Sequence, residues 1–324
     1  MSTSDADIGT GSIERVASLG GGVIGQSWTA LFLAAGKKVS VFDPDPSAPE
    51  RVRAAVAEAW PILEQLGLAE NGSPDNITFC ADAREAVDGA DFVQESVPEQ
   101  VALKHELYGL IEPVLGSGTI VASSASGLTL TEMQAGWRDP SRFILGHPFN
   151  PPHLIPLVEV MGNDRTAAGV VDAASRFYES IGKVTIEIKR EVPGHVANRL
   201  QAALWREAIH LINEGVASVE DVDKAVSAGP GLRWAAMGPT QLFHLGAGDG
   251  GLSAFCDRYT ESFNRWFDDL GTPHLDAATV SRLVAGLSAN EEPHSIEELA
   301  RRRDALIARM VALKASQEVL GGTR

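Results

Sequence analysis

The sequence predicts an α/β protein: a Rossmann-type, doubly wound and mainly parallel sheet followed by an all-α C-terminal domain. Three observations lead to this prediction. A strand, a glycine-rich loop, a helix and a second strand follow one another over residues 14–43. Short apolar strands then alternate with helical patterns as far as residue 190. Beyond that point the strand signals stop and only helical spacing of apolar residues remains.

The expected strands are short runs rich in β-branched and aromatic residues. They cover residues 15–19, 38–42, 77–79, 92–94, 119–122, 143–145 and 184–188. Helices are expected at 26–35, closed by Gly36, and after the boundary at 196–214, 219–227, 251–268, 276–287 and 296–316. Ser295 and Glu298 have the spacing of a capping box for the last helix.

These patterns divide the chain into three parts. Residues 1–12 are polar, carry Asp5 and Asp7, and are expected to be a disordered tail and not a signal peptide. Residues 13–190 form the predicted Rossmann domain, and residues 191–324 the helical domain.

Composition excludes several classes of protein. The 324 residues have 44% hydrophobic content and 22% charged content, as in soluble globular proteins. A net charge of −16 argues against nucleic-acid binding, and no run is long and apolar enough to cross a membrane. The two cysteines, Cys80 and Cys256, predict neither a disulfide scaffold nor a metal site, and we expect a cytoplasmic protein.

The loop Gly20-Gly21-Gly22-Val23-Ile24-Gly25 fits the G-x-G-x-x-G pattern of dinucleotide-binding proteins. The first glycine permits a tight turn, and the second lets a pyrophosphate approach the backbone. The third lets helix and strand pack closely, and the helix N-terminus faces the phosphates. The alternative is a glycine turn in an unrelated α/β protein.

Asp43 ends the second strand, 23 positions after Gly20. A carboxylate there accepts hydrogen bonds from the adenosine ribose, and it would repel a 2′-phosphate. The next residues, Pro44-Asp45-Pro46, offer no cation. The sequence therefore favours NAD over NADP. Glu99 and Lys104 follow another strand, where they either line the nicotinamide half of the cleft or cap a helix.

A histidine and a glutamate form the candidate catalytic pair. His147 follows the apolar run Phe143-Ile144-Leu145, and Glu159 interrupts a second apolar run at Leu154 to Val160. A carboxylate is costly to bury without a partner, and one that orients an imidazole produces a general base. A purely structural histidine–glutamate pair is the alternative.

At this point the chain resembles the 3-hydroxyacyl-CoA dehydrogenase family over about residues 13 to 290. The match rests on Ser124-Ala125-Ser126-Gly127-Leu128, His147-Pro148-Phe149-Asn150-Pro151, Val158-Glu159-Val160 and Gly194-His195-Val196-Ala197-Asn198-Arg199. The resemblance implies four functional residues, Ser126, His147, Glu159 and Asn198. Ser126 and Asn198 would hydrogen-bond the reacting oxygen or a neighbouring carboxyl group, although both residue types also cap turns and helices. The chain departs from the family pattern at Ser124, Gly127 and His195.

The run Gly231-Leu232-Arg233-Trp234 resembles the branch of the family that oxidises free acids, which contains carnitine dehydrogenases and lambda-crystallin. Arg233 is the candidate for binding the substrate carboxylate, or it pairs with a structural acid. Trp234 joins Trp205, Phe149, Phe243 and Phe255 as candidates for a cage around a quaternary ammonium group, or these aromatics belong to the core.

The resemblance thus implies NAD-dependent oxidation of the 3-hydroxyl of a small free hydroxy acid to the 3-keto acid, with L-carnitine the favoured substrate. It also implies a homodimer, with substrate binding and dimerisation in the helical domain. The alternatives are a 3-hydroxyacyl-CoA dehydrogenase, an L-gulonate 3-dehydrogenase, and a non-enzymatic, crystallin-like structural or NAD-sensing protein.

Overall fold

The computed structural model describes residues 12–288 and 295–321, and the chain divides into two compact units. The first unit runs to Val196 and also includes the C-terminal residues from Ala300 onward. The second unit spans Ala197–Leu299. Most of the C-terminal helix α13 (Ile296–Gly321) therefore groups with the first unit, and the predicted boundary near residue 190 stays a prediction. Apart from Ser12, the predicted disordered tail lies outside the described residues.

Within the described part of the chain, eight strands form one sheet in the order β3-β2-β1-β4-β5-β6-β7-β8. Every neighbouring pair is parallel except β6 and β7. The Rossmann-type, mainly parallel sheet that the sequence predicts is confirmed. The strands are β1 (Arg15–Leu19), β2 (Lys38–Phe42), β3 (Ile77–Phe79), β4 (Phe92–Glu95), β5 (Ile120–Ser123), β6 (Phe143–Pro148), β7 (Leu157–Met161) and β8 (Val184–Glu187).

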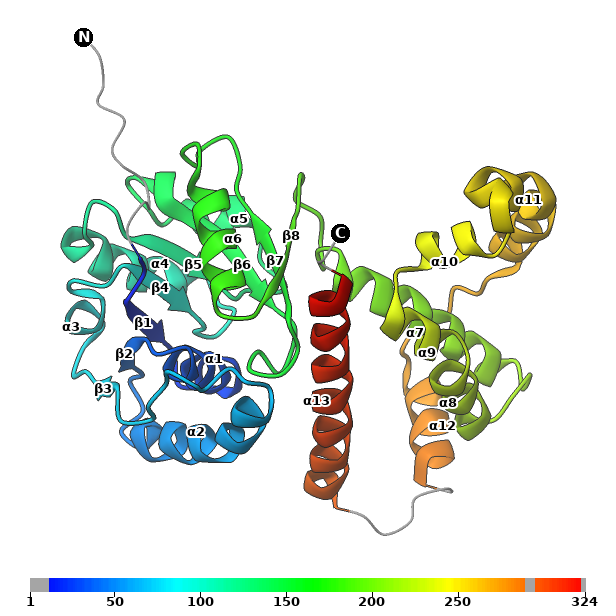
Figure 1. The fold of residues 1–324 in the computed structure, drawn as a ribbon, viewed down its shortest axis with the longest axis horizontal. Helices are drawn as coiled ribbons and strands as arrows, with labels where there is room; N and C mark the ends of the chain where they lie inside the picture. The colour runs from blue at the N-terminus through cyan, green and yellow to red at the C-terminus, as the bar shows by residue number, and fades with distance from the viewer. Residues whose placement is uncertain (1–11, 289–294, 322–324) are drawn as a thin grey trace. The chain divides into compact units, whose positions relative to one another are not determined.

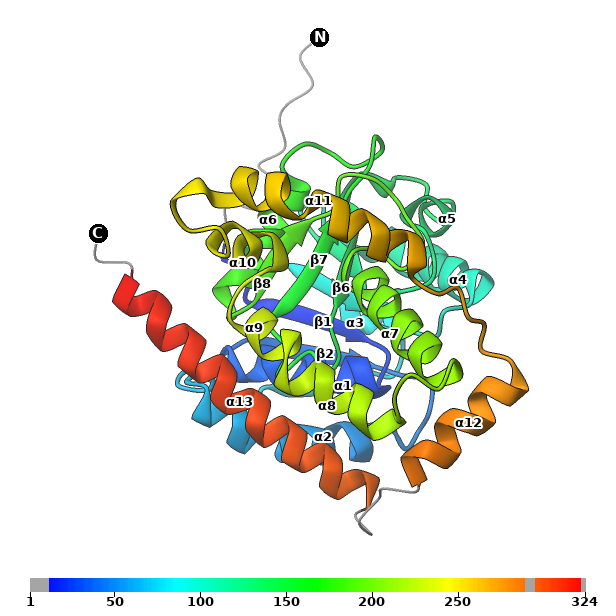
Figure 2. The same ribbon diagram turned by 90° about the vertical axis from the view of Figure 1, so that its right-hand side faces the viewer.

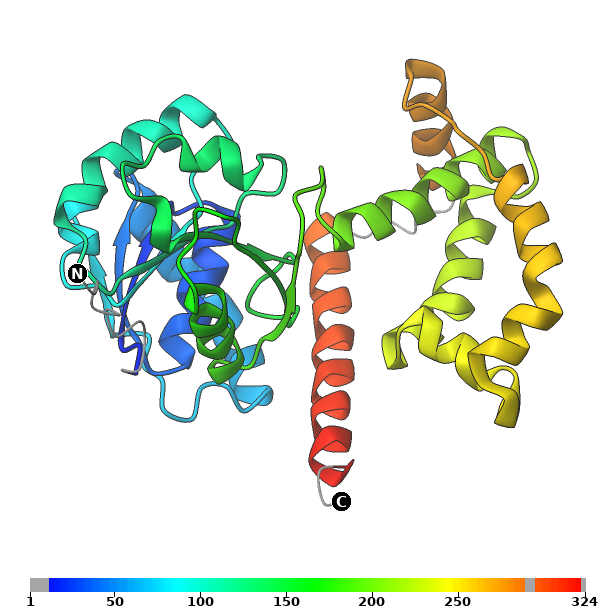
Figure 3. The ribbon, with the colours of Figure 1, turned by 90° about the horizontal axis from the view of Figure 1, so that it is seen from above.

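Helices cover both faces of this sheet (Figure 1). One apolar core joins the first face to α1 (Val23–Ala34), α2 (Ala48–Gln65) and α6 (Val170–Ser180). A second core joins the opposite face to α3 (Ala83–Val87), α4 (Val101–Ile111) and α5 (Leu130–Gln134). Successive strand residues alternate between the cores: Val16 packs in one and Ala17 in the other. Figure 3 shows the two helical layers on either side of the strands.

The strand β7 was not predicted. Its sequence was interpreted only as an apolar run interrupted by Glu159, and it follows a segment that contains Pro151, Pro152 and Pro156. β7 runs antiparallel to β6, so a short loop suffices in place of the helical crossover that parallel strands need. Because β7 follows β6 directly, this segment lacks the alternation of strand and helix patterns on which the strand prediction relied.

The described residues of the second unit form helices joined by turns and loops, with no strand, as predicted (Figure 2). The prediction missed α9 and α10, which are short and each begin with a proline at the first helical position. No helix in the described ranges is long and apolar enough to span a bilayer. The helices are α7 (Ala197–Asn213), α8 (Val219–Ala228), α9 (Pro230–Ala236), α10 (Pro239–Leu245), α11 (Gly251–Asp269) and α12 (Ala277–Ser288).

A buried lysine supports the loop between β6 and β7. Lys183 is 6% exposed and lies just before β8. Its ammonium group donates to the backbone carbonyls of Pro152 and Ile155 and lies 5.1 Å from the centroid of the Trp28 ring. Burial disfavours the charged form and lowers the pKa of Lys183 to about 7.

This burial makes the stability depend on pH. Between about pH 7 and the ordinary lysine pKa of 10.5, the unfolded chain binds a proton at Lys183 that the folded protein does not. Folding stability contributed by this group therefore rises with pH in that window, by up to about 1.4 kcal/mol per pH unit. We expect the free energy of unfolding of the unmodified protein, minus that of Lys183→Met, to increase from pH 7 to 9.5 in denaturant titrations.

The exposed Lys189 provides the control, because Lys189→Met removes a lysine of the same unit whose side chain is 77% exposed. Its difference from the unmodified protein should stay constant over the same pH range. A constant difference for Lys183→Met as well would contradict the prediction.

Candidate active site

The glycine loop joins β1 to α1, and the three glycines of its motif have different surroundings. Gly20 has a φ of 101°, and a Cβ there would lie 2.7 Å from the carbonyl oxygen of Ser96. A Cβ on Gly25 would lie 1.8 Å from the carbonyl oxygen of Gly20, so only glycine lets α1 pack this closely. A Cβ on Gly22 would meet no atom within 4 Å. Glycine at position 22 is thus not needed for packing, and a ligand that approaches the backbone explains it.

The first turn of α1 leaves its backbone N–H groups available. Gly22 is the N-cap residue, and no side chain caps the helix. Val23, the first helical residue, is 69% exposed, and Ile24 packs against the core. Free N–H groups and the positive end of the helix dipole suit a pyrophosphate.

Asp43 lies beside the loop, immediately after β2. Its carboxylate accepts hydrogen bonds from the backbone N–H groups of Gly21, at 2.6 Å, and Asp45, at 2.9 Å. This holds an acceptor where the adenosine ribose of a dinucleotide lies. The nearby Arg51 forms an ion pair with Asp45 at 2.8 Å, so the charge of Arg51 is already compensated. The loop, the helix terminus and Asp43 therefore fit NAD.

His147 and Glu159 face each other across the antiparallel pair of strands. They are register partners in β6 and β7, and the Nδ1 atom of His147 lies 2.8 Å from Oε2 of Glu159. His147 is 5% exposed and Glu159 is fully buried. A carboxylate can only accept, so Nδ1–H donates and the neutral ring carries its lone pair on Nε2. The predicted pair therefore has the geometry of an oriented general base.

The second carboxylate oxygen of Glu159 is also bound. Oε1 accepts the backbone N–H of Val196 at 2.9 Å. Val196 ends the first unit and follows Gly194 and His195, which have φ values of 75° and 52°. His195 is the one non-glycine residue with a positive φ among the described residues. The turn at 194–196 thus fixes the acid that orients His147.

The ring of His195 lies against that of His147, although the sequence analysis assigned His195 no role. Its centroid is 5.0 Å from that of His147, and the side chain is 3% exposed. Nε2 lies 3.2 Å from the carbonyl oxygen of Ala125, which can only accept, so Nε2 carries the proton. Burial lowers the pKa of His195, the Ala125 hydrogen bond opposes that shift, and the charge of His147 adds to it.

Ser126 and Glu99 form a second cluster next to Ala125. The hydroxyl of Ser126 donates to Oε1 of Glu99 at 2.7 Å, and the N–H groups of Ser126 and Gly127 donate to the same carboxylate. Burial opposes ionisation of Glu99, but these hydrogen bonds outweigh it and hold its pKa below the usual value. The hydroxyl proton of Ser126 is therefore directed to Glu99.

Lys104 is placed differently from the cofactor-lining position that the sequence suggested. It is 1% exposed on α4, and its ammonium group pairs with Glu95 at 2.5 Å. Glu95 also accepts hydrogen bonds from the hydroxyls of Tyr108 and Ser123. The charge of Lys104 is thus compensated by Glu95, and this buried network holds α4 to the sheet. We therefore leave Lys104 out of the proposed site.

The remaining predicted residues belong to the second unit. Asn198 lies in the first turn of α7 and, with Trp205 and Asp223, lines a hollow of about 780 Å³ between α7 and α8. Arg233 and Trp234 lie on α9, and both are exposed. Within the described ranges no acid pairs with Arg233, so the alternative of a structural ion pair is not supported. The roles of Asn198, Arg233 and Trp234 stay predictions.

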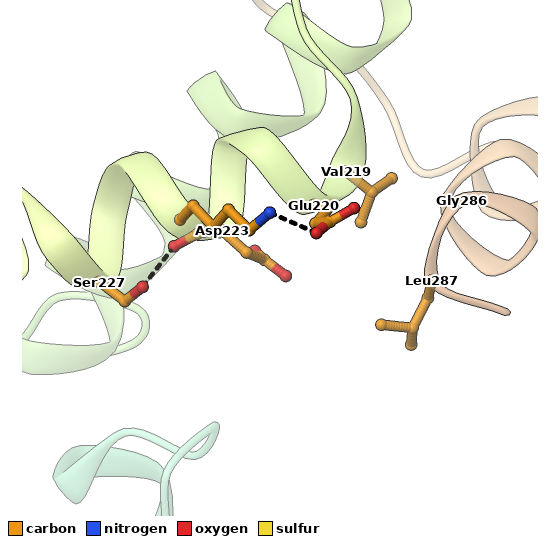
Figure 4. Close-up of a pocket in the computed structure, with 7 residues that line it drawn as sticks. Val219, Glu220, Asp223, Ser227, Gly286 and Leu287 are labelled. Atoms are coloured by element: carbon orange, nitrogen blue, oxygen red, sulfur yellow. Dashed lines mark hydrogen bonds and ion pairs between the residues drawn. The ribbon is translucent and has the colours of Figure 1, made fainter. Parts of the chain in front are cut away.

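A smaller pocket in the second unit carries no catalytic group. It lies between α8 and α12 and is lined by Val219 and Leu287 (Figure 4). Its polar side chains bind within α8: Lys224 donates to Glu220, and the hydroxyl of Ser227 donates to the carbonyl of Asp223 at 2.8 Å. These groups are already satisfied within one helix.

Comparison with known proteins decides the family. A family model described as 3-hydroxyacyl-CoA dehydrogenase, NAD binding domain, matches residues 15–192, and the C-terminal domain of the same family matches residues 194–279. The chain belongs to the 3-hydroxyacyl-CoA dehydrogenase family. It is an NAD-dependent oxidoreductase, and the cofactor inferred from the glycine loop and Asp43 is confirmed.

The chain is also similar to individual members. It is 48% identical to an L-carnitine dehydrogenase of Streptomyces griseus over 90% of this chain and 87% of that protein. It is 42% identical to one of Pseudomonas aeruginosa over 94% of this chain and 95% of that protein. A crystal structure of 5-formyl-3-hydroxy-2-methylpyridine 4-carboxylic acid 5-dehydrogenase superimposes with a TM-score of 0.80 at 32% identity, covering 96% of this chain and all of that one.

The different demands on Gly22 and Gly25 give a matched pair of variants. In Gly22→Ala the added methyl group meets no protein atom, so we expect unchanged thermal stability and at least tenfold weaker NAD binding, measured by calorimetry. In Gly25→Ala the methyl group collides with backbone, so we expect a loss of stability of about 1–3 kcal/mol. Tight NAD binding by Gly22→Ala would show that no phosphate approaches position 22.

Proposed function

We propose that this protein oxidises the 3-hydroxyl of a small free hydroxy acid with NAD, and that its substrate is L-carnitine, giving 3-dehydrocarnitine. The observation that carries the chemistry is the buried register pair of His147 and Glu159. The choice of substrate is supported by the similarity to L-carnitine dehydrogenases over most of both chains.

In this proposal His147 acts as the general base. Its neutral Nε2 removes the proton of the alcohol, and Glu159 keeps the ring in the required tautomer and stabilises the imidazolium that forms. Bound NAD supplies the acceptor for the hydride. Because both oxygens of Glu159 are held, by His147 and by Val196, the ring needs little reorganisation when the charge appears.

In this proposal Ser126, Asn198 and Arg233 bind the substrate. We keep Ser126 and Asn198 as partners of the reacting oxygen or of a neighbouring carboxyl group. Arg233 is proposed to bind the carboxylate through its two-point guanidinium fork. Its exposure and the lack of an ion pair within the described residues leave it free for this role.

Turnover measurements on the purified protein test this function. We expect NAD-dependent oxidation of L-carnitine with a kcat/KM well above that for L-gulonate or 3-hydroxybutyryl-CoA. His147→Ala should lower kcat by about 10²–10⁴-fold, because proton removal loses its base, and leave the dissociation constant of NAD nearly unchanged. Preference for the CoA thioester would reject the substrate assignment. An equal loss of NAD binding in the variant would make His147 structural, and no turnover across the panel would support a non-enzymatic protein.

We also propose that the protein is a homodimer assembled through its second unit. Large apolar side chains are exposed there: Leu200 at 65%, Trp266 at 52%, Phe267 at 62% and Val284 at 58%. Exposed apolar surface of this kind is typical of an interface. We expect twice the chain mass in light scattering and a shift towards monomer in Phe267→Asp. A monomer at micromolar concentrations of the unmodified protein would contradict this.

A further inference from the structure

We propose that Ser96 and Ser124 bind the ribose next to the nicotinamide of NAD, and that the buried side chain of Gln94 directs their hydroxyl protons towards this ribose. NAD is the cofactor of the family to which the chain belongs, so the two serines can be assigned without knowing which hydroxy acid is oxidised. A chain of hydrogen-bonded side chains carries the proposal, because it ends at the carboxyl edge of the sheet with one hydroxyl proton left for a ligand.

The two serines lie where the sheet reverses its strand order. Ser96 follows β4, and its backbone N–H donates to the carbonyl of Leu19 at the end of β1, at 2.7 Å. Ser124 follows β5, and its backbone N–H donates to the carbonyl of Glu95 at 2.8 Å. The chain leaves β1 for β2 on one side and later returns to β4 on the other side. Dinucleotides bind outside the carboxyl ends of the strands at such a reversal point.

The order of the strands indicates which part of the dinucleotide reaches the serines. Asp43, after β2, suits the adenosine ribose, and the glycine loop after β1 suits the pyrophosphate. The other half of NAD therefore continues over the ends of β4 and β5 towards β6, which carries His147. Ser96 adjoins the loop, because a Cβ on Gly20 would lie 2.7 Å from the carbonyl oxygen of Ser96. In this direction the first group after the pyrophosphate is the second ribose.

Gln94 fixes the direction of the hydrogen bonds. It is fully buried on β4, and its Nε2 atom lies 3.3 Å from the carbonyl oxygen of Gly146, which can only accept. The amide is therefore oriented with Nε2 as the donor to Gly146, and Nε2 also donates to the hydroxyl oxygen of Ser124 at 2.8 Å. At the other end of the amide, Oε1 accepts the hydroxyl of the buried Tyr178 at 2.6 Å. Both polar atoms of the Gln94 side chain are thus satisfied.

The serine pair keeps one proton for a ligand. The hydroxyl oxygens of Ser96 and Ser124 lie 2.9 Å apart, so one of their two protons forms the hydrogen bond between them. The hydroxyl of Ser124 cannot donate to Nε2 of Gln94, because that nitrogen is itself a donor. Within the described residues, neither hydroxyl is hydrogen-bonded to any further acceptor. Both serines are partly exposed, so one O–H group and free lone pairs are available to a ligand.

A ribose matches the hydrogen-bonding capacity of this pair. Its neighbouring 2′- and 3′-hydroxyls each donate and accept, so one can accept the remaining O–H of the serines while the other donates to a serine oxygen. The free N–H groups of α1 suit the pyrophosphate, and Asp43 suits the adenosine ribose. This leaves the second ribose as the part of NAD that the two serines bind.

Three ligands of increasing length test the assignment by calorimetry: ADP, ADP-ribose and NAD. ADP ends at the pyrophosphate, ADP-ribose adds the second ribose, and NAD adds the nicotinamide. In Ser124→Ala and in Ser96→Ala we expect the affinity for ADP to equal that of the unmodified protein. The affinities for ADP-ribose and NAD should both fall about three- to tenfold, which is the effect of losing one neutral hydrogen bond.

Ser123→Ala is the matched control. The hydroxyl of Ser123 donates to the buried carboxylate of Glu95 and not to the serine pair, so all three affinities should stay unchanged. Gln94→Met keeps a buried side chain of similar length and removes the amide, so the hydroxyl of Ser124 can turn to the carbonyl of Gly146. ADP-ribose should then bind more weakly while ADP binds as before, and an unchanged affinity for ADP-ribose would remove Gln94 from the proposal.

Each contrary result for the serine variants has a distinct meaning. Weaker binding of ADP would assign the pair to the pyrophosphate and overturn the ribose assignment. A loss confined to NAD would assign the pair to the nicotinamide instead, and no loss for any ligand would show that the hydroxyls bind no part of the cofactor. These measurements use no hydroxy acid, so the proposed function and the ribose assignment fail independently. The serine variants decide the assignment even if Gln94→Met does not fold.

Discussion

The site depends on the burial of one carboxylate. Glu159 is fully buried between strands, and a carboxylate there is tolerated only when its oxygens are hydrogen-bonded. One oxygen accepts a hydrogen bond from the imidazole of His147, and the other accepts one from the backbone N–H of Val196. The antiparallel register of β6 and β7 sets the first contact, and the strained turn before Val196 sets the second. A single electrostatic requirement thus connects two strands to the end of the nucleotide-binding unit.

Two glutamates near the end of β4 lie in contrasting environments. Glu95 is buried with the ammonium of Lys104 and two hydroxyl donors, so its charge is consumed inside the sheet. Glu99 is four residues later, exposed, and bound only by neutral donors. The same residue type therefore joins a buried ion pair at one position and orders an exposed turn at the other.

Much of the fold and of the candidate site could be predicted from the sequence, because the motifs that indicate them are local. The glycine loop and Asp43 together indicate a dinucleotide site. Glu159, in its apolar run, indicates a buried carboxylate that needs a hydrogen-bond partner. The position of His195 against His147 could not be predicted, since it depends on contacts with Ala125, 70 positions earlier, and with His147. The burial of Lys104 could not be predicted either. A lysine in an amphipathic helix normally reaches solvent, and only the fold shows that Lys104 pairs with Glu95.

The C-terminal helix gives the first unit a discontinuous chain. Residues up to Val196 and from Ala300 belong together, while Ala197–Leu299 form an insertion between them. On the ribosome, the Rossmann sheet emerges complete long before α13 is synthesised. The nascent nucleotide-binding unit must therefore wait for the entire helical insertion before its last segment, with the fully buried Ala308, can dock. This order of synthesis favours a sheet that is stable by itself and a late-arriving helix that completes its surface.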